Sequence, residues 1–153
     1  MKIRVVWVGK TQEAWIKTGI EEYAGRIRRY APLEISEAKE EKGAMREAGR
    51  AAECARLAKL LPKNACLVLL DEGGDELDSR QLATFIEKQR DSAVPELVFA
   101  IGGAYGFSDE FRRQAQRTIA LSRLTFTHQM VRLFLLEQIY RGFTILNNEP
   151  YHH

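Results

Sequence analysis

Two loops near the carboxyl end of this chain place glycines and hydroxyl side chains directly after apolar, strand-like segments. They span residues 101–108 and 120–128 of the 153 residues. Segments of this kind leave backbone N–H and C=O groups free and let a ligand come close to the main chain. In parallel α/β sheets, loops at the carboxyl ends of strands form small-molecule sites. The two loops together therefore predict a ligand-binding site.

Titratable rings lie beside the second loop and at the chain end. His128 follows the loop, and the chain closes on Tyr151, His152 and His153. A neutral imidazole can take a proton near neutral pH, so these rings are candidates for acid–base chemistry. The alternatives are structural: His128 as a first-turn helix residue bonded to nearby backbone, and the terminal histidines as a disordered tail or a cloning-tag remnant. Pro150 stiffens the approach to the terminal rings and favours an ordered end.

The composition is that of one globular domain spanning residues 1–153. Apolar residues make up 45% of the chain and charged residues 29%, and no apolar run approaches the ~20 residues of a membrane span. The first residues lack the small-residue cleavage site of a signal peptide, so we expect a cytoplasmic protein. Cys54 and Cys66 lack the Cys-x-x-Cys spacing of zinc and redox sites, and we expect buried free thiols.

Several familiar chemistries lack their motifs. The loop at 102–106 does not end in Lys-Ser/Thr as a P-loop does, so ATP chemistry is not predicted. The acidic segment 71–78 lacks the spacing of a calcium loop, and no serine or cysteine occupies a nucleophile elbow. The formal net charge of +2 is small for a dedicated nucleic-acid binder, but clustered arginines form either solvated helix faces or a site for an RNA-sized anion. These arginines are Arg26, Arg28, Arg29, Arg112, Arg113, Arg117, Arg123, Arg132 and Arg141.

Short apolar runs alternate with helical apolar stripes along the whole chain. This alternation predicts an α/β fold with an open, mostly parallel sheet and helices on both faces. Ser79 and Ser108 are placed to cap helices, and an acidic turn is expected after Leu70. The predicted strands cover residues 3–8, 33–36, 65–70, 97–101 and 118–121, and the predicted helices cover residues 16–30 and 45–58 and follow Ser79, Ser108 and His128.

The last predicted helix is apolar around most of its circumference. A helix of this kind needs a second covering surface in addition to the sheet, and in a small domain a second copy of the chain can supply it. The sequence therefore predicts a homodimer. The apolar residues concerned are Met130, Val131, Leu133, Phe134, Leu135, Leu136, Ile139 and Tyr140.

Taken in order, the motifs of this chain resemble one family over essentially its whole length. The chain is similar to the small bacterial SPOUT-class methyltransferases that methylate N3 of a pseudouridine in large-subunit (23S) ribosomal RNA. The resemblance implies a trefoil knot in the carboxyl-terminal half, S-adenosylmethionine bent into the knotted loops, and a dimer that completes each site. The motifs that carry it lie at residues 8–10, 70–71, 101–106, 121–125, 128–132, 138–141 and 148–152.

The same resemblance implies a cofactor site formed mainly by backbone groups. Backbone amides and carbonyls would contact the adenine, while glycines admit the ribose and methionine portions, and a β-carbon at Gly103 would project into ligand space. No metal is implied. Family members have proline where this chain has Thr127 and Gln129, and arginine where it has His153. The implied cofactor residues are Leu70, Gly103, Ser122, Arg123, Leu124, Thr125, Phe126 and Thr127.

Methyl transfer from a sulfonium is an in-line displacement, so the implied enzyme must align the acceptor nitrogen and exclude water. We expect His152 to take the imide proton, oriented by Tyr151, with His128 as the second candidate. Arg132 and Arg141 are expected to bind RNA phosphate or stabilise a developing imide anion.

A chain of this size without a separate RNA-binding domain has little surface for reading sequence. We therefore expect its partner to be 23S rRNA within the assembled 70S ribosome or large subunit. Two other functions stay open: a non-catalytic ribosome-binding or assembly factor of the same fold, and a transfer-RNA methyltransferase. Binding of S-adenosylmethionine distinguishes the first from an enzyme, and the RNA that is methylated distinguishes the second.

Overall fold

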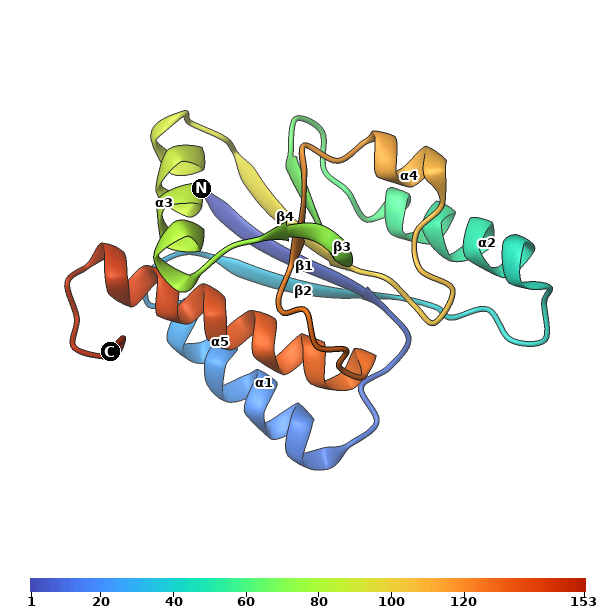
Figure 1. Ribbon diagram of the computed structural model, residues 1–153, viewed down its shortest axis with the longest axis horizontal. Coiled ribbons are helices and arrows are strands. Elements are labelled where there is room, and N and C mark those ends of the chain that lie inside the picture. The colour runs from blue at the N-terminus through green and yellow to red at the C-terminus, as the bar shows by residue number, and fades with distance from the viewer.

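An entirely parallel five-stranded sheet in the order β2-β1-β4-β3-β5 forms the centre of the molecule (Figure 1). The structure is a computed structural model and describes residues 1–153. The expectation of a parallel α/β sheet is confirmed. The strands are β1 (Lys2–Val8), β2 (Leu33–Ala38), β3 (Cys66–Glu76), β4 (Glu96–Ile101) and β5 (Arg117–Ala120).

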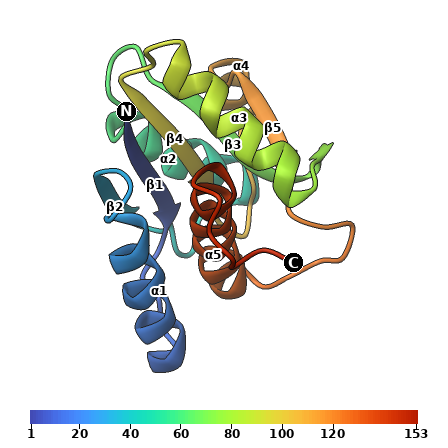
Figure 2. The same cartoon turned by 90° about the vertical axis from the view of Figure 1, so that its left-hand side faces the viewer.

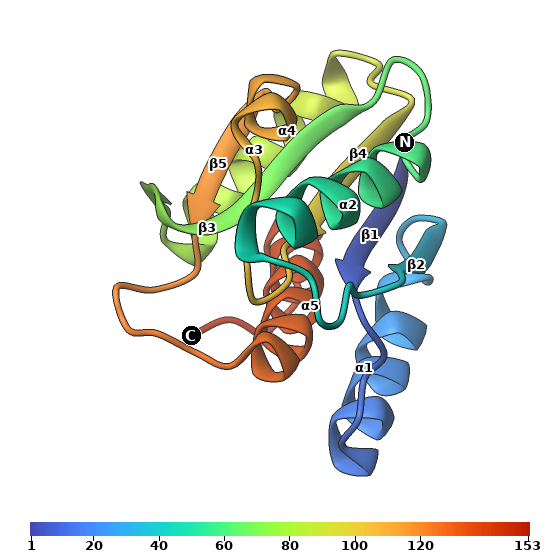
Figure 3. The same ribbon diagram turned by 90° about the vertical axis from the view of Figure 1, so that its right-hand side faces the viewer.

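Helices cover both faces of this sheet, because the strand side chains are apolar on both sides. Ile3, Val5 and Trp7 of β1 belong to the core beneath α1, α3 and α5, whereas Val6 and Val8 belong to the core beneath α2 and α4. Figures 2 and 3 show α1 and α5 side by side on one face, and Figure 3 shows α2 across the other. The helices are α1 (Ala14–Ile27), α2 (Arg46–Lys59), α3 (Ser79–Asp91), α4 (Asp109–Arg113) and α5 (His128–Leu146).

The strand order brings the carboxyl ends of β3, β4 and β5 together. β3 pairs with β4 on one side and with β5 on the other, so the chain after β4 crosses over β3 to reach the sheet edge. The helix that follows β1 lies on one face and the helix that follows β4 lies on the other. Ligands of open α/β sheets bind outside the carboxyl ends of strands at such a switch point.

β3 is longer than the sequence predicts. Leu70 and Asp75 both pair with Ile119 of β5, so residues 71–74 form a bulge and the strand resumes to Glu76. A β-carbon on Gly74 would lie 2.7 Å from backbone atoms of Ile119, and the glycine therefore permits this close approach of the strands. The expectation that an acidic turn ends the strand at Leu70 is wrong.

α3 and α5 begin at well-defined caps. Asp78, not Ser79, is the N-cap of α3: its carboxylate accepts from the Gln81 N–H (2.7 Å), and the Gln81 side chain accepts from the Asp78 N–H (2.8 Å). This reciprocal pair is a capping box. Thr127 caps α5 by accepting from the Met130 N–H (3.2 Å). The predicted cap at Ser79 is one residue late, while the predicted start of α5 at His128 is confirmed.

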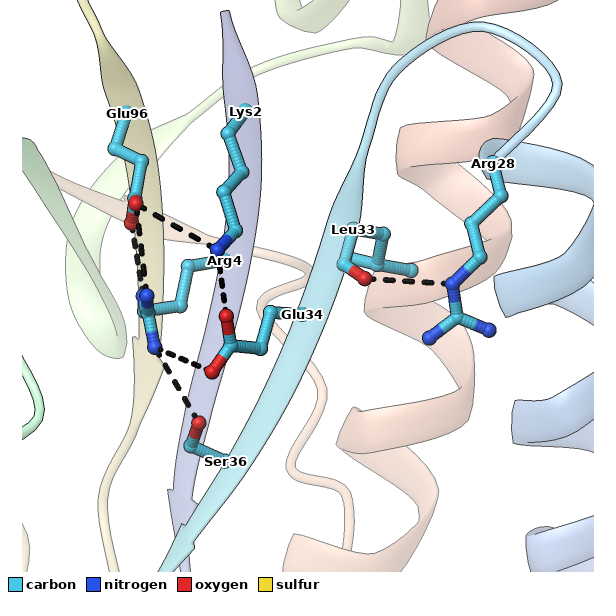
Figure 4. A network of polar contacts seen from close by, with 7 residues as sticks. All are labelled: Lys2, Arg4, Arg28, Leu33, Glu34, Ser36 and Glu96. Atoms are coloured by element: carbon cyan, nitrogen blue, oxygen red, sulfur yellow. Dashed lines mark hydrogen bonds and ion pairs between the residues drawn. The ribbon is translucent and has the colours of Figure 1, made fainter.

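The opposite end of the sheet carries a polar network that ties the strand starts together (Figure 4). Arg4 of β1 donates to Glu34 of β2 (3.0 Å) and to Glu96 of β4 (2.8 Å), and Lys2 donates to Glu34 (2.5 Å). The hydrogen bond with Glu96 is the main cause that raises the pKa of Arg4, and the one from Lys2 lowers the pKa of Glu34. All members of this network are paired, so it is a structural feature remote from the strand ends that carry the loops.

Both cysteines are free and buried, as expected. Cys54 lies on α2 and Cys66 begins β3, where burial raises the pKa of its thiol. None of the five helices is both long enough and apolar enough to cross a membrane.

Candidate active site

A small cavity of about 200 Å³ lies at the carboxyl ends of β3, β4 and β5. Five of the eight predicted cofactor residues line it: Leu70, Gly103, Ser122, Leu124 and Phe126. The sheet thus brings together two loops that are separate in the sequence. The other lining residues are Asp71, Glu72, Ile101, Gly102, Gly106, Phe107, Leu121, His128 and Val131.

The remaining three predicted cofactor residues belong to the same loop without lining this cavity. Arg123 is largely exposed, with its Nε 3.6 Å from a carboxylate oxygen of Glu76. Thr125 is exposed, and Thr127 is engaged as the cap of α5.

The backbone of the loop at 122–126 is free to meet a ligand. None of its N–H or C=O groups bonds to another backbone group, and its one internal contact is a hydrogen bond from the Leu124 N–H to Ser122 Oγ (3.0 Å). Unpaired backbone groups in a partly enclosed place are costly unless a ligand or water satisfies them. This arrangement fits recognition of a ligand by the main chain.

The glycine loop at residues 102–106, after β4, is held in place by contacts with α2. The Gly106 N–H donates to the Gly103 carbonyl (3.0 Å), which closes a tight turn, and Gly106 adopts a φ of 72° that favours glycine. Arg50 Nε of α2 donates to the Tyr105 carbonyl (2.8 Å), and the Ser108 N–H donates to Cys54 Sγ (3.3 Å). The position of this wall of the cavity therefore depends on α2.

The role expected for Gly103 needs correction. A β-carbon there would lie 2.7 Å from Glu53 Oε1 and 3.2 Å from Val8 Cγ1, so it would project into the α2 side of the core and not into ligand space. Glu53 is 3% exposed; its Oε2 accepts from the Glu41 N–H (3.1 Å), and its Oε1 has no partner. Glu53 is not predicted from the sequence, because a lone glutamate in a helix gives no signal of burial.

A larger cavity of about 770 Å³ adjoins the first and shares three lining residues with it: Leu121, Ser122 and Phe126. It lies between the start of α3, the end of β5, α5 and the chain end. The other residues that line it are Leu77, Asp78, Ser79, Arg80, Leu82, Ile119, Ala120, Phe134, Glu137, Gln138 and His152.

The chain end is folded against α5, which contradicts a disordered tail. The Tyr151 hydroxyl donates to Glu137 Oε1 (3.1 Å) and lies 3.3 Å from the Tyr23 hydroxyl. Its ring packs on Tyr140 with centroids 4.7 Å apart. Burial is the main cause that raises the pKa of Tyr151, so its phenol stays protonated. Tyr151 thus anchors the segment that carries His152.

The two candidate histidines lie in different cavities. His128 is exposed at the start of α5 and lines the smaller cavity, whereas His152 is half-buried and lines the larger one. The Nδ1 atom of His152 lies 3.2 Å from Arg141 Nη1. His153 is exposed at the terminus.

Arg132 is wrongly predicted as an RNA-binding residue, because it is 2% exposed. Its guanidinium donates to the Val8 carbonyl (2.7 Å) and to Thr11 Oγ1 (2.9 Å), and lies 4.9 Å from the Trp7 ring centroid. Desolvation lowers its pKa. Arg132 therefore joins α5 to the end of β1, and phosphate cannot reach it.

The guanidinium of Arg141 is also occupied. It donates to the carboxylate of Glu137 through Nε (3.1 Å) and Nη2, contacts His152 through Nη1, and lies 4.7 Å from the Tyr151 ring centroid. The hydrogen bond with Glu137 is the main cause that raises its pKa. These contacts hold Arg141 against His152 and Glu137 and leave it no free pair of N–H groups for a phosphate group.

The sequence matches the model of a family described as a predicted SPOUT methyltransferase over residues 1–152. It is 70% identical to the ribosomal RNA large subunit methyltransferase H of Geobacter sulfurreducens over the full length of both chains. It is 71% identical to the protein of that name from Geobacter metallireducens, over 100% of this chain and 99% of that one. The chain therefore belongs to the SPOUT methyltransferase family.

Two solved structures share the fold. A putative methylase family protein from Neisseria gonorrhoeae superposes with a TM-score of 0.53 at 12% identity, over 99% of this chain and 85% of that chain. A probable methyltransferase from Bordetella pertussis superposes with a TM-score of 0.52 at 14% identity, over 92% of this chain and 96% of that chain. A trefoil knot in the carboxyl-terminal half is characteristic of this fold class.

Membership of this family makes the protein a methyltransferase that uses S-adenosylmethionine. The smaller cavity fits that cofactor: half of its lining residues are apolar, and the adjacent loop offers free backbone donors and acceptors. At about 200 Å³ it is smaller than the roughly 300–1,000 Å³ of pockets that bury a drug-sized ligand. The larger cavity adjoins it at Leu121, Ser122 and Phe126 and offers space for the part of the cofactor that the smaller cavity cannot hold.

Proposed function

We propose that this protein methylates N3 of a pseudouridine in 23S rRNA of the large ribosomal subunit. The observation that carries the proposal is the pair of adjoining cavities, which share Leu121, Ser122 and Phe126. One has the free backbone loop that suits S-adenosylmethionine, and the other is large enough for a nucleotide. The names of the two Geobacter relatives support the choice of large-subunit RNA.

When bound, the cofactor supplies an electrophilic methyl group for an in-line displacement. The loop at 122–126 holds it through backbone groups, and Ser122 lies where the two cavities meet. The target base enters the larger cavity, where Phe126 and Phe134 offer apolar surfaces that exclude water. The protein thus promotes the reaction mainly by aligning the acceptor nitrogen with the methyl group.

The histidines serve the acceptor side of the reaction. His152 lines the cavity assigned to the base, and Tyr151 fixes its approach. His128 lines the cavity assigned to the cofactor and is the second candidate. The geometry favours His152, because a group that acts on the base must lie beside it.

We infer that RNA phosphate is bound by arginines other than Arg132 and Arg141. Arg80 is exposed at the rim of the larger cavity, and the side chain of Arg123 is 85% exposed at the loop. Exposed guanidiniums suit phosphate, whereas those of Arg132 and Arg141 are engaged within the chain. An assembled ribosome or large subunit as partner places the enzyme in the cytoplasm.

We propose a homodimer that covers a smaller part of α5 than the sequence predicts. α1 and α3 flank α5, so Leu136, Ile139 and Tyr140 are buried within one chain. Leu133 and Phe134 are only partly buried, and the nearby Leu124 is 71% exposed. A second copy that covers this region would also narrow the open cavities.

The proposal is tested by offering purified protein and labelled S-adenosylmethionine to large subunits, whole ribosomes and transfer RNA from cells that lack this gene. We expect label only in 23S rRNA. Label in transfer RNA would support that alternative instead. Heat of cofactor binding in calorimetry separates an enzyme from a non-catalytic assembly factor, which would bind no cofactor.

A further inference from the structure

The contact between His152 and Arg141 determines which ring nitrogen of His152 carries a proton. Arg141 Nη1 lies 3.2 Å from His152 Nδ1. A guanidinium has N–H donors and no acceptor, so Nδ1 must be the acceptor in this hydrogen bond. A neutral imidazole has one N–H, which then lies on Nε2.

Arg141 is held in this orientation from its other side. Its Nε and Nη2 donate to Glu137, which also accepts from the Tyr151 hydroxyl (3.1 Å) and from Gln138 Nε2 (3.0 Å). The guanidinium of Arg141 is therefore held between Glu137 and His152. The Nε2 atom of His152 has no partner within the chain, and the residue lines the larger cavity.

We propose that Arg141 is a positioning residue that fixes His152 as the Nε2–H tautomer, so that His152 donates a hydrogen bond to the target base and does not take its proton. The acceptor is a carbonyl oxygen beside N3. This inference rests on the proposed function and replaces the general-base role that the sequence suggested. A donor at this place stabilises the imide anion, whose charge is shared by its carbonyl oxygens.

The reaction balances without a protein base. The imide proton leaves N3 to water or hydroxide, and the electron pair that stays on N3 forms the bond to the methyl carbon. The carbon–sulfur bond breaks, and sulfur keeps its pair as a neutral thioether. The Nδ1 lone pair of His152 accepts from Arg141 Nη1, so this nitrogen is not free to take the imide proton.

Charged and titratable groups face His152 from three sides. Arg141 and Glu137 lie on α5, and Asp78 and Arg80 lie at the start of α3 across the cavity. Tyr151 and His153 are its neighbours in sequence. Among these groups, Arg141 has the direct contact that sets the tautomer.

The first test reads the tautomer directly from ¹⁵N chemical shifts of the histidine rings in the free protein. For His152 we expect the shift of a protonated, pyrrole-like Nε2 and of an unprotonated, pyridine-like Nδ1. These shifts should be unchanged in Arg141→Lys. In Arg141→Met they should move toward the averaged values of a mixture of the two tautomers. The exposed His128 and His153 serve as internal references and are assigned by substitution. A pyrrole-like Nδ1 in the wild-type protein would overturn the proposal, whatever the substrate proves to be.

The second test separates a donor from a base by its effect on turnover. His152→Gln keeps an N–H donor but has no basic nitrogen, so we expect it to retain kcat within about tenfold. His152→Ala should lose on the order of a hundredfold or more, the scale for one anion-stabilising donor. Both should keep the pH dependence of the wild type. If His152→Gln falls as far as His152→Ala and both lose a pH-dependent limb, His152 is a base and the proposal fails.

The two tests fail separately from the proposed function. If the wild-type protein methylates no 23S rRNA but shows the expected ring shifts, the proposed substrate is wrong and the tautomer stands. If 23S rRNA is methylated and the shifts show a proton on Nδ1, the substrate stands and the role of Arg141 is refuted. Calorimetry of S-adenosylmethionine with each variant controls for loss of the cofactor site.

Discussion

Gly103 lies in the loop after β4, where that loop packs against Glu53 of α2. The sequence predicts that the missing β-carbon makes room for the ligand. The structure shows that it makes room for Glu53, whose buried carboxylate lies directly behind the loop. We therefore propose that Gly103 acts on the cofactor through the position of its loop.

We predict that Gly103→Ala lowers the affinity for S-adenosylmethionine at least tenfold, or about 1.4 kcal/mol, because the new methyl group collides with Glu53 and shifts the loop. Calorimetry measures the effect. Gly25→Ala is a matched control, since nothing lies within 4 Å of its added carbon. Adding Glu53→Ala to Gly103→Ala should restore part of the affinity. No recovery in that double variant would argue against the collision as the cause.

Arg132 and Arg123 both have other roles than the sequence alone suggests: Arg132 is buried, and Arg123 is exposed at the loop. Arg132→Met should lower the free energy of unfolding by about 2 kcal/mol, because the Val8 carbonyl and the Thr11 hydroxyl lose a charged donor. Arg123→Ala should leave stability unchanged and weaken ribosome binding, with a shallower salt dependence. Chemical denaturation and binding at several salt concentrations measure the two effects. An exchange of these outcomes would restore Arg132 as the RNA contact.

At the scale of elements, the sequence predicts much of the fold and less of the site. Periodicity locates the strands and α5, because burial on one or both faces leaves a pattern in the residues. It does not reveal the bulge at residues 71–74, which depends on pairing with Ile119. It also cannot show that Arg132 is buried, since charged residues are mostly exposed and only its contacts with β1 explain the exception.

The docked chain end gives an element-scale prediction. Deleting residues 151–153 should leave cofactor affinity within a few fold, because the loop at 122–126 makes no contact with the tail in the hydrogen-bond network. Methylation should fall on the order of a hundredfold or more through loss of the His152 donor. Deleting His153 alone is the control and should cost little. Full activity of the longer truncation would remove the tail from the site.

A second element-scale prediction concerns pH. Tyr30, after α1, donates to Glu149 near the chain end (2.5 Å), and burial and this bond raise its pKa to about 12. The folded state thus retains the phenol proton to a higher pH than the unfolded state. This stabilisation is complete below about pH 10 and is lost as the pH rises toward about 12. Tyr30→Phe should flatten the fall in unfolding free energy across that window. Parallel curves for the two proteins would contradict the linkage.

At the scale of the whole molecule, one chain provides both cavities but leaves them open. Leu124 and Trp15 are large apolar side chains with 71% and 57% exposure, and Phe134 is only partly covered. We predict a dimer in sedimentation at micromolar concentration. Met45→Ser, which changes an 84% exposed side chain on the α2 side, should not alter the association. A monomer that methylates ribosomes at the full rate would exclude a shared site.

The most direct test of the whole account is mass spectrometry of 23S rRNA from cells with and without this gene. We predict one base-methylated pseudouridine that is absent from the deletion strain. The wild-type gene should restore it, and the tail truncation should not. An unchanged 23S rRNA, or a methyl group lost from transfer RNA instead, would contradict the proposed function.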